Sequence, residues 1–465
     1  MRTFTVKGAD GEDISHNVFE MVGFPPLIDY QMAYPVILER SCYRTIFNGL
    51  MEKTKEYLGT VDVNLVVDGN PGIGKSRFYL YCIFRLVHGL LDEDKTFGEY
   101  ILVLNCGEKY HKYSWKEKVF TTVNKEEVAR LQRVKNVVRL IEATSSELLS
   151  WMGVSILFSS PELQKVSKFK RITSWSFISP VWSLDELQVC NMFLDSRLKL
   201  TDDDLVSRYS EYGGIPRSVF SLNQQEKRDN VAAAIDSFDP DILSFSKPVH
   251  AIHFNVVAMV PTTPETFETL YEFMFLSKVI ADKIVMQERE DIVAQLAQAL
   301  VPNVRYDFDE TFRGQLYELF VHRWFAQSTK VKAKTISLRT LGKTERVTYY
   351  RSTSREFAVD ALILEPTTKA ETFAGVCYGL LMTINAKQPI DAKGVDKLVK
   401  WSTARNYSFV YVFVVPSALE ANYMWQQIDS LSGEEHNRTR YLNDMVQLVA
   451  AVDPYIDIKP NRRKV

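Results

Sequence analysis

The most constraining feature of the sequence is the stretch at residues 69–76, which reads GNPGIGKS. It fits the pattern G-x-x-x-x-G-K-[ST], in which glycines offer bare backbone where side chains would otherwise pack. A buried-strand run precedes it at residues 61–67, and a largely apolar helical run follows at residues 77–89. This strand, loop and helix context is the one that confirms the pattern, and it predicts a parallel sheet covered by helices.

The chemistry of this loop predicts a site for ATP and Mg²⁺. Glycines allow positive φ and close approach, so that consecutive N–H groups and the following helix start can surround a phosphate. Lys75 is expected to reach the β- and γ-phosphates, and Ser76 to place its hydroxyl on the metal. The competing interpretation is a glycine-rich turn without a ligand. The residues that we expect to contact the nucleotide are Gly69, Asn70, Pro71, Gly72, Ile73, Gly74, Lys75, Ser76, Arg77 and Ser160.

Hydrolysis requires further groups at the ends of neighbouring strands. Glu142 follows the apolar run VVRLI and is the best candidate to hold the metal or orient water, whereas Asn105 is a weaker, neutral candidate. Ser159 and Ser160 end the run ILFSS, where a polar side chain could sense the γ-phosphate. Arg217 follows the turn YGGIP and could reach the phosphates from a helical subdomain. Each of these residues has an ordinary structural alternative, an acid or serine at a strand end or a surface arginine.

The pattern along the chain predicts an α/β protein in four parts. Residues 1–35 show no clear period and are treated as an N-terminal extension. Residues 36–182 alternate helical runs with strand runs at 61–67, 100–106, 136–143, 154–160 and 174–180, which is typical of a parallel sheet. Residues 183–300 are predicted to be helical throughout, with capping signals at SLDE and TDDD. Residues 301–465 place strand runs around the helical stretches 309–327 and 394–406, and predict a separate mixed α/β domain.

Several of these stretches together resemble one family. The P-loop with its RFYLY helix, followed by LFSSPE, ISPVWSLDEL and YGGIPR, is similar to the NTPase of the Crinkler effectors, which is shared with retrotransposon hot-spot proteins. The resemblance covers roughly residues 35–450. It implies a P-loop NTPase of AAA/STAND type with a helical lid, joined to a C-terminal restriction-endonuclease-like domain. The stretches EFAVDALIL and LLMTINAKQPIDAKGVDKL resemble the core of that second domain.

The resemblance implies a second, metal-dependent site that acts on nucleic acid. A nuclease of this kind needs a carboxylate on one strand, and a second ligand with a basic residue on the next. Asp360 fits the first position, Glu318 could be a further ligand from the preceding helix, and Lys387 could replace a catalytic lysine. The sequence departs from the family pattern at Leu381 and Gln388, so it lacks part of the metal site that the family pattern contains. A solvated helix acid is the alternative for Glu318.

Charge and composition limit the partners. The formal net charge is -2, from 56 basic and 58 acidic residues, which argues against a whole-chain clamp on DNA but not against a local basic patch. Tyr349 and Tyr350 stand in a basic stretch, which suits a nucleic-acid backbone, DNA more than RNA. A solvated hairpin is the alternative. The basic residues of this stretch are Lys330, Lys332, Lys334, Arg339, Lys343, Arg346, Arg351 and Arg355.

The remaining expectations concern compartment and biological role. The five cysteines lack metal-ligand spacing and are interpreted as reduced, mostly buried residues. The sequence shows no signal peptide, no ubiquitin-like header and no apolar run of membrane-spanning length, so a membrane is not expected as a partner. By resemblance the protein is a secreted effector acting in a host nucleus, with a host protein and a homo-oligomer among its conceivable partners. Otherwise it is cytoplasmic or nuclear. The competing class is a nucleotide-switched interaction protein that cuts nothing.

Overall fold

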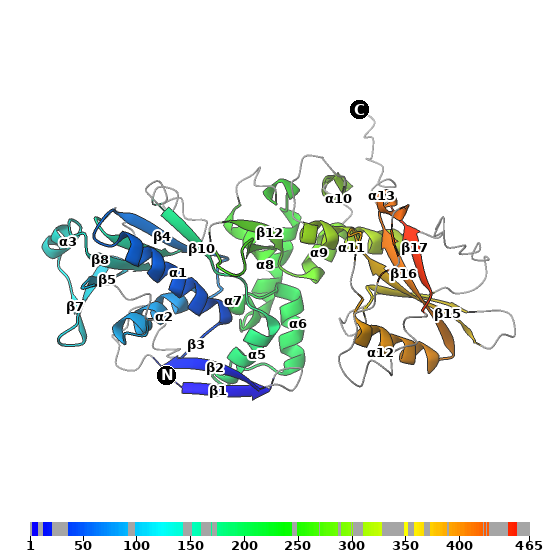
Figure 1. The fold of residues 1–465 in the computed structure, drawn as a ribbon, viewed down its shortest axis with the longest axis horizontal. Helices are drawn as coiled ribbons and strands as arrows, with labels where there is room; N and C mark the ends of the chain where they lie inside the picture. Colours follow the sequence, from blue (N-terminus) through cyan, green and yellow to red (C-terminus); the bar gives the residue numbers. More distant parts are fainter. Residues whose placement is uncertain are drawn as a thin grey trace, which may run out of the picture. The chain divides into compact units, whose positions relative to one another are not determined.

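The computed structural model describes a chain of two compact units, residues 1–281 and residues 282–465 (Figure 1). Each unit is described by itself below. The four-part division expected from the sequence stays a prediction. The described residues are 2–7, 13–20, 36–91, 98–142, 151–159, 169, 174–243, 249–268, 270–286, 290–298, 300, 310–327, 348–351, 358–366, 373–387, 390–421, 423–424, 426 and 445–452.

The first unit is built on a seven-stranded sheet in the order β10-β4-β9-β8-β5-β6-β7. Five strands are parallel, and β6 and β7 extend the sheet as an antiparallel pair. The parallel strands expected from the apolar runs are confirmed, because β4, β8 and β9 are buried along their whole length. The strands are β4 (Val63–Asp68), β5 (Ile101–Cys106), β6 (Lys109–Ser114), β7 (Val119–Thr122), β8 (Val137–Glu142), β9 (Val154–Phe158) and β10 (Ser174–Ile178).

Helices α1 (Ser41–Tyr57) and α2 (Lys75–Val87) cover one face of this sheet and pack against β8 and β9 (Figure 1). Their buried apolar side chains form one core with those of the strands, including Phe47, Leu50 and Phe78. The opposite face carries the short helix α3 (Lys125–Leu131) and a second cluster around Trp151. The run SSELLSWM at residues 145–152 also predicts a short helix, but its residues 145–150 lie outside the described part of the chain.

The N-terminal residues form a three-stranded antiparallel sheet that the sequence analysis missed. Its strands are β1 (Arg2–Lys7), β2 (Asp13–Glu20) and β3 (Val36–Leu38). Phe19 of β2 meets Tyr81 and Phe84 of α2 edge-on, with ring centroids 5.2 and 5.0 Å apart. The segment is therefore packed on the main core. The signal was present in the alternation of polar and apolar residues in RTFTVK, which is typical of a strand.

Residues 183–243 are helical, as expected. The two predicted N-caps are confirmed, because the Ser183 hydroxyl accepts from Glu186 N within a capping box, and the Thr201 hydroxyl accepts from Asp204 N. The elements are α5 (Leu184–Met192), α6 (Asp202–Tyr212), α7 (Pro216–Val219), α8 (Gln224–Asp236) and the 3₁₀ turn η2 (Pro240–Ile242). A further 3₁₀ turn, η3 (Ala251–Asn255), follows this segment.

The expectation of helix across residues 246–300 is wrong for its first half. β11 (Val257–Pro261) and β12 (Tyr271–Phe275) form an antiparallel hairpin. In YEFMF the aromatic residues Phe273 and Phe275 alternate with less buried ones, so a period of two competes with the helical pattern. Helices resume with α9 (Lys278–Met286), on which the boundary between the units falls, and α10 (Glu290–Gln298).

The second unit is a five-stranded mixed sheet in the order β13-β14-β15-β16-β17. The first three strands are antiparallel, and β15, β16 and β17 are parallel. The mixed α/β character expected from the sequence is confirmed, and this sheet is compatible with the expected second domain. The elements are α11 (Glu310–Gln327), β13 (Thr348–Arg351), β14 (Ala361–Pro366), β15 (Gly375–Met382), α12 (Ala392–Thr403), β16 (Tyr407–Val415), α13 (Ser417–Glu420) and β17 (Gln447–Ala451). Among the described residues no helix is long and apolar enough to cross a membrane.

Candidate nucleotide site

The loop between β4 and α2 has the backbone conformation of a phosphate-binding loop. Gly69, Gly72 and Gly74 have φ of 143°, 85° and 96°. A Cβ at Gly69 would lie 2.5 Å from the carbonyl oxygen of Ser179, and a Cβ at Gly72 would lie 2.9 Å from Cβ of Arg217. Only glycine meets both the conformation and the close approach at these two positions. The chain is thus a P-loop NTPase in fold, with helix α2 starting at Lys75.

Lys75 is buried within this loop. Its Nζ donates to the carbonyl oxygen of Gly69 at 2.6 Å and to that of Asn70 at 2.8 Å. The ammonium group is thus held by two main-chain dipoles that it can exchange for phosphate oxygens. Because Lys75 is buried, its positive charge interacts more strongly with a bound anion than it would in water.

Ser76 and Glu142 meet, although 66 residues separate them in sequence. The Ser76 hydroxyl donates to Oε1 of Glu142 at 2.9 Å. Glu142 is the last residue of β8 and is 5% exposed. Strand β9 lies between β4 and β8, so the parallel order places the glycine loop and this acid at the same edge of the sheet. A hydroxyl and a carboxylate are oxygen ligands of the kind that Mg²⁺ prefers.

The other strand-end candidates are placed as follows. Ser159 follows β9, is fully buried, and its N–H donates to the carbonyl oxygen of Val67. Ser160 lies outside the described residues. The Asn105 amide donates to the carbonyl oxygen of Gly107 and accepts from the buried guanidinium of Arg139, so it is already engaged away from Glu142.

Arg217 lies directly against the glycine loop. Its N–H donates to the carbonyl oxygen of Gly72 at 3.4 Å, and it occupies the short helix α7. Its side chain is exposed. The backbone contact holds α7 beside the loop, so the exposed side chain of Arg217 lies on an element adjacent to the candidate site.

The loop is also held by residues that the sequence analysis did not single out. The indole N–H of Trp182 donates to the carbonyl oxygen of Ile73 at 2.7 Å. The guanidinium of Arg40 stacks 4.7 Å from the Trp182 ring and pairs with Glu186 at 2.9 Å. In the sequence, Trp182 stands in the stretch PVWSLDE, directly before a capping box. This stretch was used for the family resemblance, but it did not by itself predict a contact between Trp182 and the glycine loop.

Asn70 differs from its neighbours in the motif because its side chain points out of the loop. It is fully buried and bonds to main-chain groups of β11, at Val257 and Met259. The hairpin that replaced the expected helix therefore contacts the loop directly.

Burial raises the pKa of several groups around the site. It raises the pKa of Tyr79 well above its ordinary value, and the neighbouring Cys106 and Glu142 add to the effect. It raises the pKa of the Cys42 thiol to about 11 and of the Cys190 thiol to about 12. All five cysteines are free, as expected. These two thiols stay protonated at neutral pH, so they are poor nucleophiles and poor metal ligands.

The second unit places Asp360 immediately before β14. Its Oδ2 accepts from the N–H of Met382, the last residue of the neighbouring strand β15, at 2.7 Å. Glu318 of α11 contacts Nε2 of His322 at 3.2 Å, and Lys387 is exposed beyond the end of β15. Within the described ranges, no group of three or more His, Cys, Asp and Glu side chains gathers as a metal site.

Two of the expected features of this unit lie outside the described residues. Gln388 is one, and most of the basic stretch is the other, including Lys330, Lys332, Lys334 and Arg355. Tyr349, Tyr350 and Arg351 are placed in β13 by their backbone.

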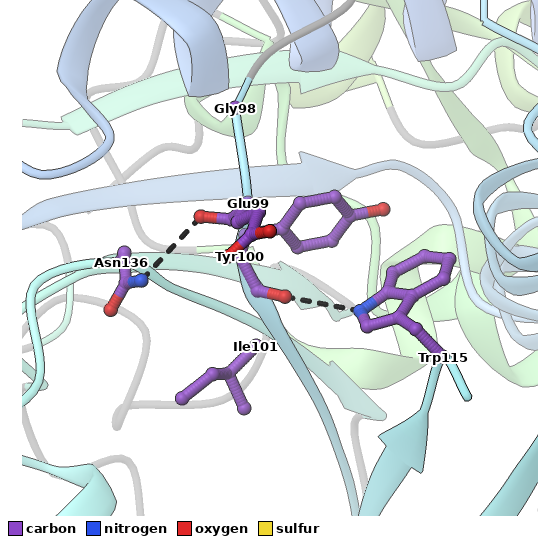
Figure 2. Close-up of a pocket in the computed structure, with 6 residues that line it drawn as sticks. All are labelled: Gly98, Glu99, Tyr100, Ile101, Trp115 and Asn136. Atoms are coloured by element: carbon purple, nitrogen blue, oxygen red, sulfur yellow. Dashed lines mark hydrogen bonds between the residues drawn. The ribbon is translucent and has the colours of Figure 1, made fainter. Parts of the chain in front are cut away.

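A cavity of about 550 Å³ lies at the opposite edge of the first sheet (Figure 2). It is lined by Tyr100 and Ile101 at the start of β5, and by Trp115, Glu99 and Asn136 among others. Trp115 Nε1 donates to the carbonyl oxygen of Tyr100, and Asn136 Nδ2 donates to that of Glu99 (Figure 2). The groups that can hold phosphate and metal gather at the carboxyl edge, so we place the candidate site there.

Comparisons with known proteins do not assign this chain to a family. No protein-family model matches the sequence, and no curated protein matches it. The ORC2 protein of Aeropyrum pernix in its ADP form is 10% identical, with a TM-score of 0.27, over 67% of this chain and 84% of that chain. A Drosophila ORC structure bound to DNA is 13% identical, with a TM-score of 0.25, over 62% of this chain and 74% of that one. At such TM-scores neither likeness supports an argument, and the fold assignment rests on the loop and the strand order.

We predict that Trp182→Phe destabilises the first unit by about 1–3 kcal/mol, because it keeps the ring but leaves the buried carbonyl of Ile73 without its donor. Trp115→Phe is the matched control: it also removes an indole N–H bonded to a main-chain carbonyl, but at a side chain that is 42% exposed, where water can replace the donor. Urea unfolding of both variants measures the difference. Equal decreases in the free energy of unfolding of the two variants would show that the buried Trp182 bond stabilises the unit no more than the exposed Trp115 bond does.

Proposed function

We propose that this chain binds Mg²⁺-ATP at residues 69–76 and hydrolyses it slowly, as an NTPase of AAA/STAND type. The observation that supports this most directly is the contact between Ser76 and Glu142 beneath a glycine loop that contains Lys75. Lys75 would face the β- and γ-phosphates, and Ser76 and Glu142 would hold the metal. The metal would supply charge neutralisation at the phosphates. Arg217 and the serines after β9 would distinguish ATP from ADP, since a ligand shifts a conformational equilibrium only through differential contacts.

We further propose that the ATP-binding unit controls the second unit, and that the protein is a Crinkler-like effector acting on nucleic acid in a host nucleus. This part rests on the family resemblance and on the basic stretch between Lys330 and Arg355. Asp360, Glu318 and Lys387 stay the candidates for a nuclease centre. Asp360 would have to bind metal while accepting the N–H of Met382.

One observation favours a second candidate, a nucleotide-switched module that binds nucleic acid or a partner protein without cutting. The strand opposite Asp360 offers Leu381, Met382 and Thr383 where a second ligand is needed, and Thr383 is buried. A single carboxylate ligand is a weak site for Mg²⁺, which usually needs a further acid or a substrate phosphate. Metal-dependent cleavage of plasmid DNA by the wild type, lost in Asp360→Asn, would decide for the nuclease.

We predict that Lys75→Ala weakens ATP binding by about 30-fold or more, because it removes a charge-assisted contact to the phosphates. Calorimetric titration with ATP in the presence of Mg²⁺ measures the change. Lys199→Ala, which removes a lysine from an exposed position of the same unit, is the control and should bind as the wild type does. Unchanged affinity in Lys75→Ala would refute the proposed site.

We predict that the full chain binds duplex DNA in a salt-dependent manner through its basic stretch. Neutralising Lys330, Lys332 and Lys334 together should weaken binding and flatten the plot of log affinity against log salt by ~0.9 per lost phosphate contact. Fluorescence anisotropy with a short labelled duplex measures both effects. A slope identical to that of the wild type would remove this stretch from the interface, and no binding at low salt would favour a protein partner.

A further inference from the structure

The side-chain amide of Asn70 forms two short hydrogen bonds with strand β11. Nδ2 donates to the carbonyl oxygen of Val257 at 2.7 Å, and Oδ1 accepts from the N–H of Met259, also at 2.7 Å. Asn70 is fully buried, and 187 residues separate it from Val257. Both polar atoms of the amide are therefore used by a segment that is remote in sequence.

The two bonds have the geometry of strand pairing. In a β-strand, the carbonyl of one residue and the N–H of the residue two positions on point to the same edge. β12 occupies one edge of β11, with Met259 opposite Phe273. The Asn70 amide satisfies the other edge as a peptide group would. The glycine loop is thereby attached to the hairpin, which runs directly into α9.

The main chain of Asn70 carries the attachment on to Lys75. The Asn70 carbonyl oxygen accepts from Nζ of Lys75 at 2.8 Å, next to the bond from Gly69. A shift of the Asn70 peptide group would move one of the two acceptors that hold the ammonium. We infer that Asn70 is a positioning residue, which fixes the loop to β11 and so holds Lys75 where phosphate would meet it. This inference rests on the proposed ATP site.

Replacement by aspartate separates positioning through the amide from general packing. In Asn70→Asp, an ionised carboxylate keeps an acceptor for Met259 N–H but turns a second lone pair towards the carbonyl of Val257, which is repulsive. The protonated acid can donate to that carbonyl, as the amide does. Burial beside a carbonyl raises the pKa of such an acid above its ordinary value of about 3.9, and the Lys75 ammonium, bonded to the main-chain carbonyl of the same residue, acts in the opposite direction. The binding-competent form is then present below the raised pKa and is lost as pH rises through it.

The test compares ATP affinity in Asn70→Asp and the wild type by calorimetry with Mg²⁺, at about pH 8 and about pH 5.5. The ratio of the two dissociation constants cancels the titration of ATP itself. We expect Asn70→Asp to bind at least about tenfold more weakly at the higher pH, and within about threefold of the wild type at the lower pH. Asn64→Asp is the matched control: Asn64 is also buried, and its amide donates to the carbonyl of Phe169 at 2.9 Å, but it lies near the start of β4. Its ratio should stay near one at both pH values.

The other possible results would contradict either the proposed function or the inference about Asn70. A wild type that binds no ATP overturns the proposed function and this inference with it. Wild-type affinity in Asn70→Asp at the higher pH overturns the inference alone. If circular dichroism shows Asn70→Asp unfolded at the higher pH, Asn70→Ala replaces it, which removes both bonds without adding charge. Asn70→Ala should also bind at least about tenfold more weakly, and wild-type affinity there overturns the inference.

Discussion

The contact between the Ser76 hydroxyl and the Glu142 carboxylate depends on the order of the strands more than on either residue. Parallel strands bring their carboxyl ends to one edge of a sheet, and ligands of open α/β sheets bind at that edge. With β9 inserted between β4 and β8, the glycine loop, Ser159 and Glu142 follow one another along it. The largely apolar sequences of these strands, buried throughout, explain why they lie inside the sheet and not at its edges.

Three separate segments of the chain hold the glycine loop in its conformation. Trp182 bonds to Ile73, the N–H of Arg217 bonds to Gly72, and the Asn70 side chain bonds to β11. A loop that is already ordered loses little conformational entropy when its N–H groups bind a phosphate, and the affinity is higher for that reason. The same contacts tie the loop to the lid helices and to the hairpin, so a ligand that moves the loop would act on both.

The sequence predicted the elements whose signals are local. The glycine spacing, the continuous apolar strands and the N-caps at Ser183 and Thr201 each have a short-range physical cause, and each is found where it was expected. The pairing of Ser76 with Glu142 was predictable because strand ends meet at one edge. The β11–β12 hairpin was not, since its aromatic residues fit two periods and its pairing with Asn70 spans most of the first unit. The anchoring by Trp182 could not be read from the sequence either, because it depends on packing between remote segments.

The central claim is that Ser76 and Glu142 form one metal site. A double-mutant cycle with Ser76→Ala and Glu142→Gln tests it most directly, with the gain in ATP affinity on adding Mg²⁺ as the measured quantity. The account predicts that each single variant loses most of that gain and that the double variant loses little more, because both side chains hold the same ion. Independent losses that add in the double variant, or a full Mg²⁺ effect in Glu142→Gln, would contradict it.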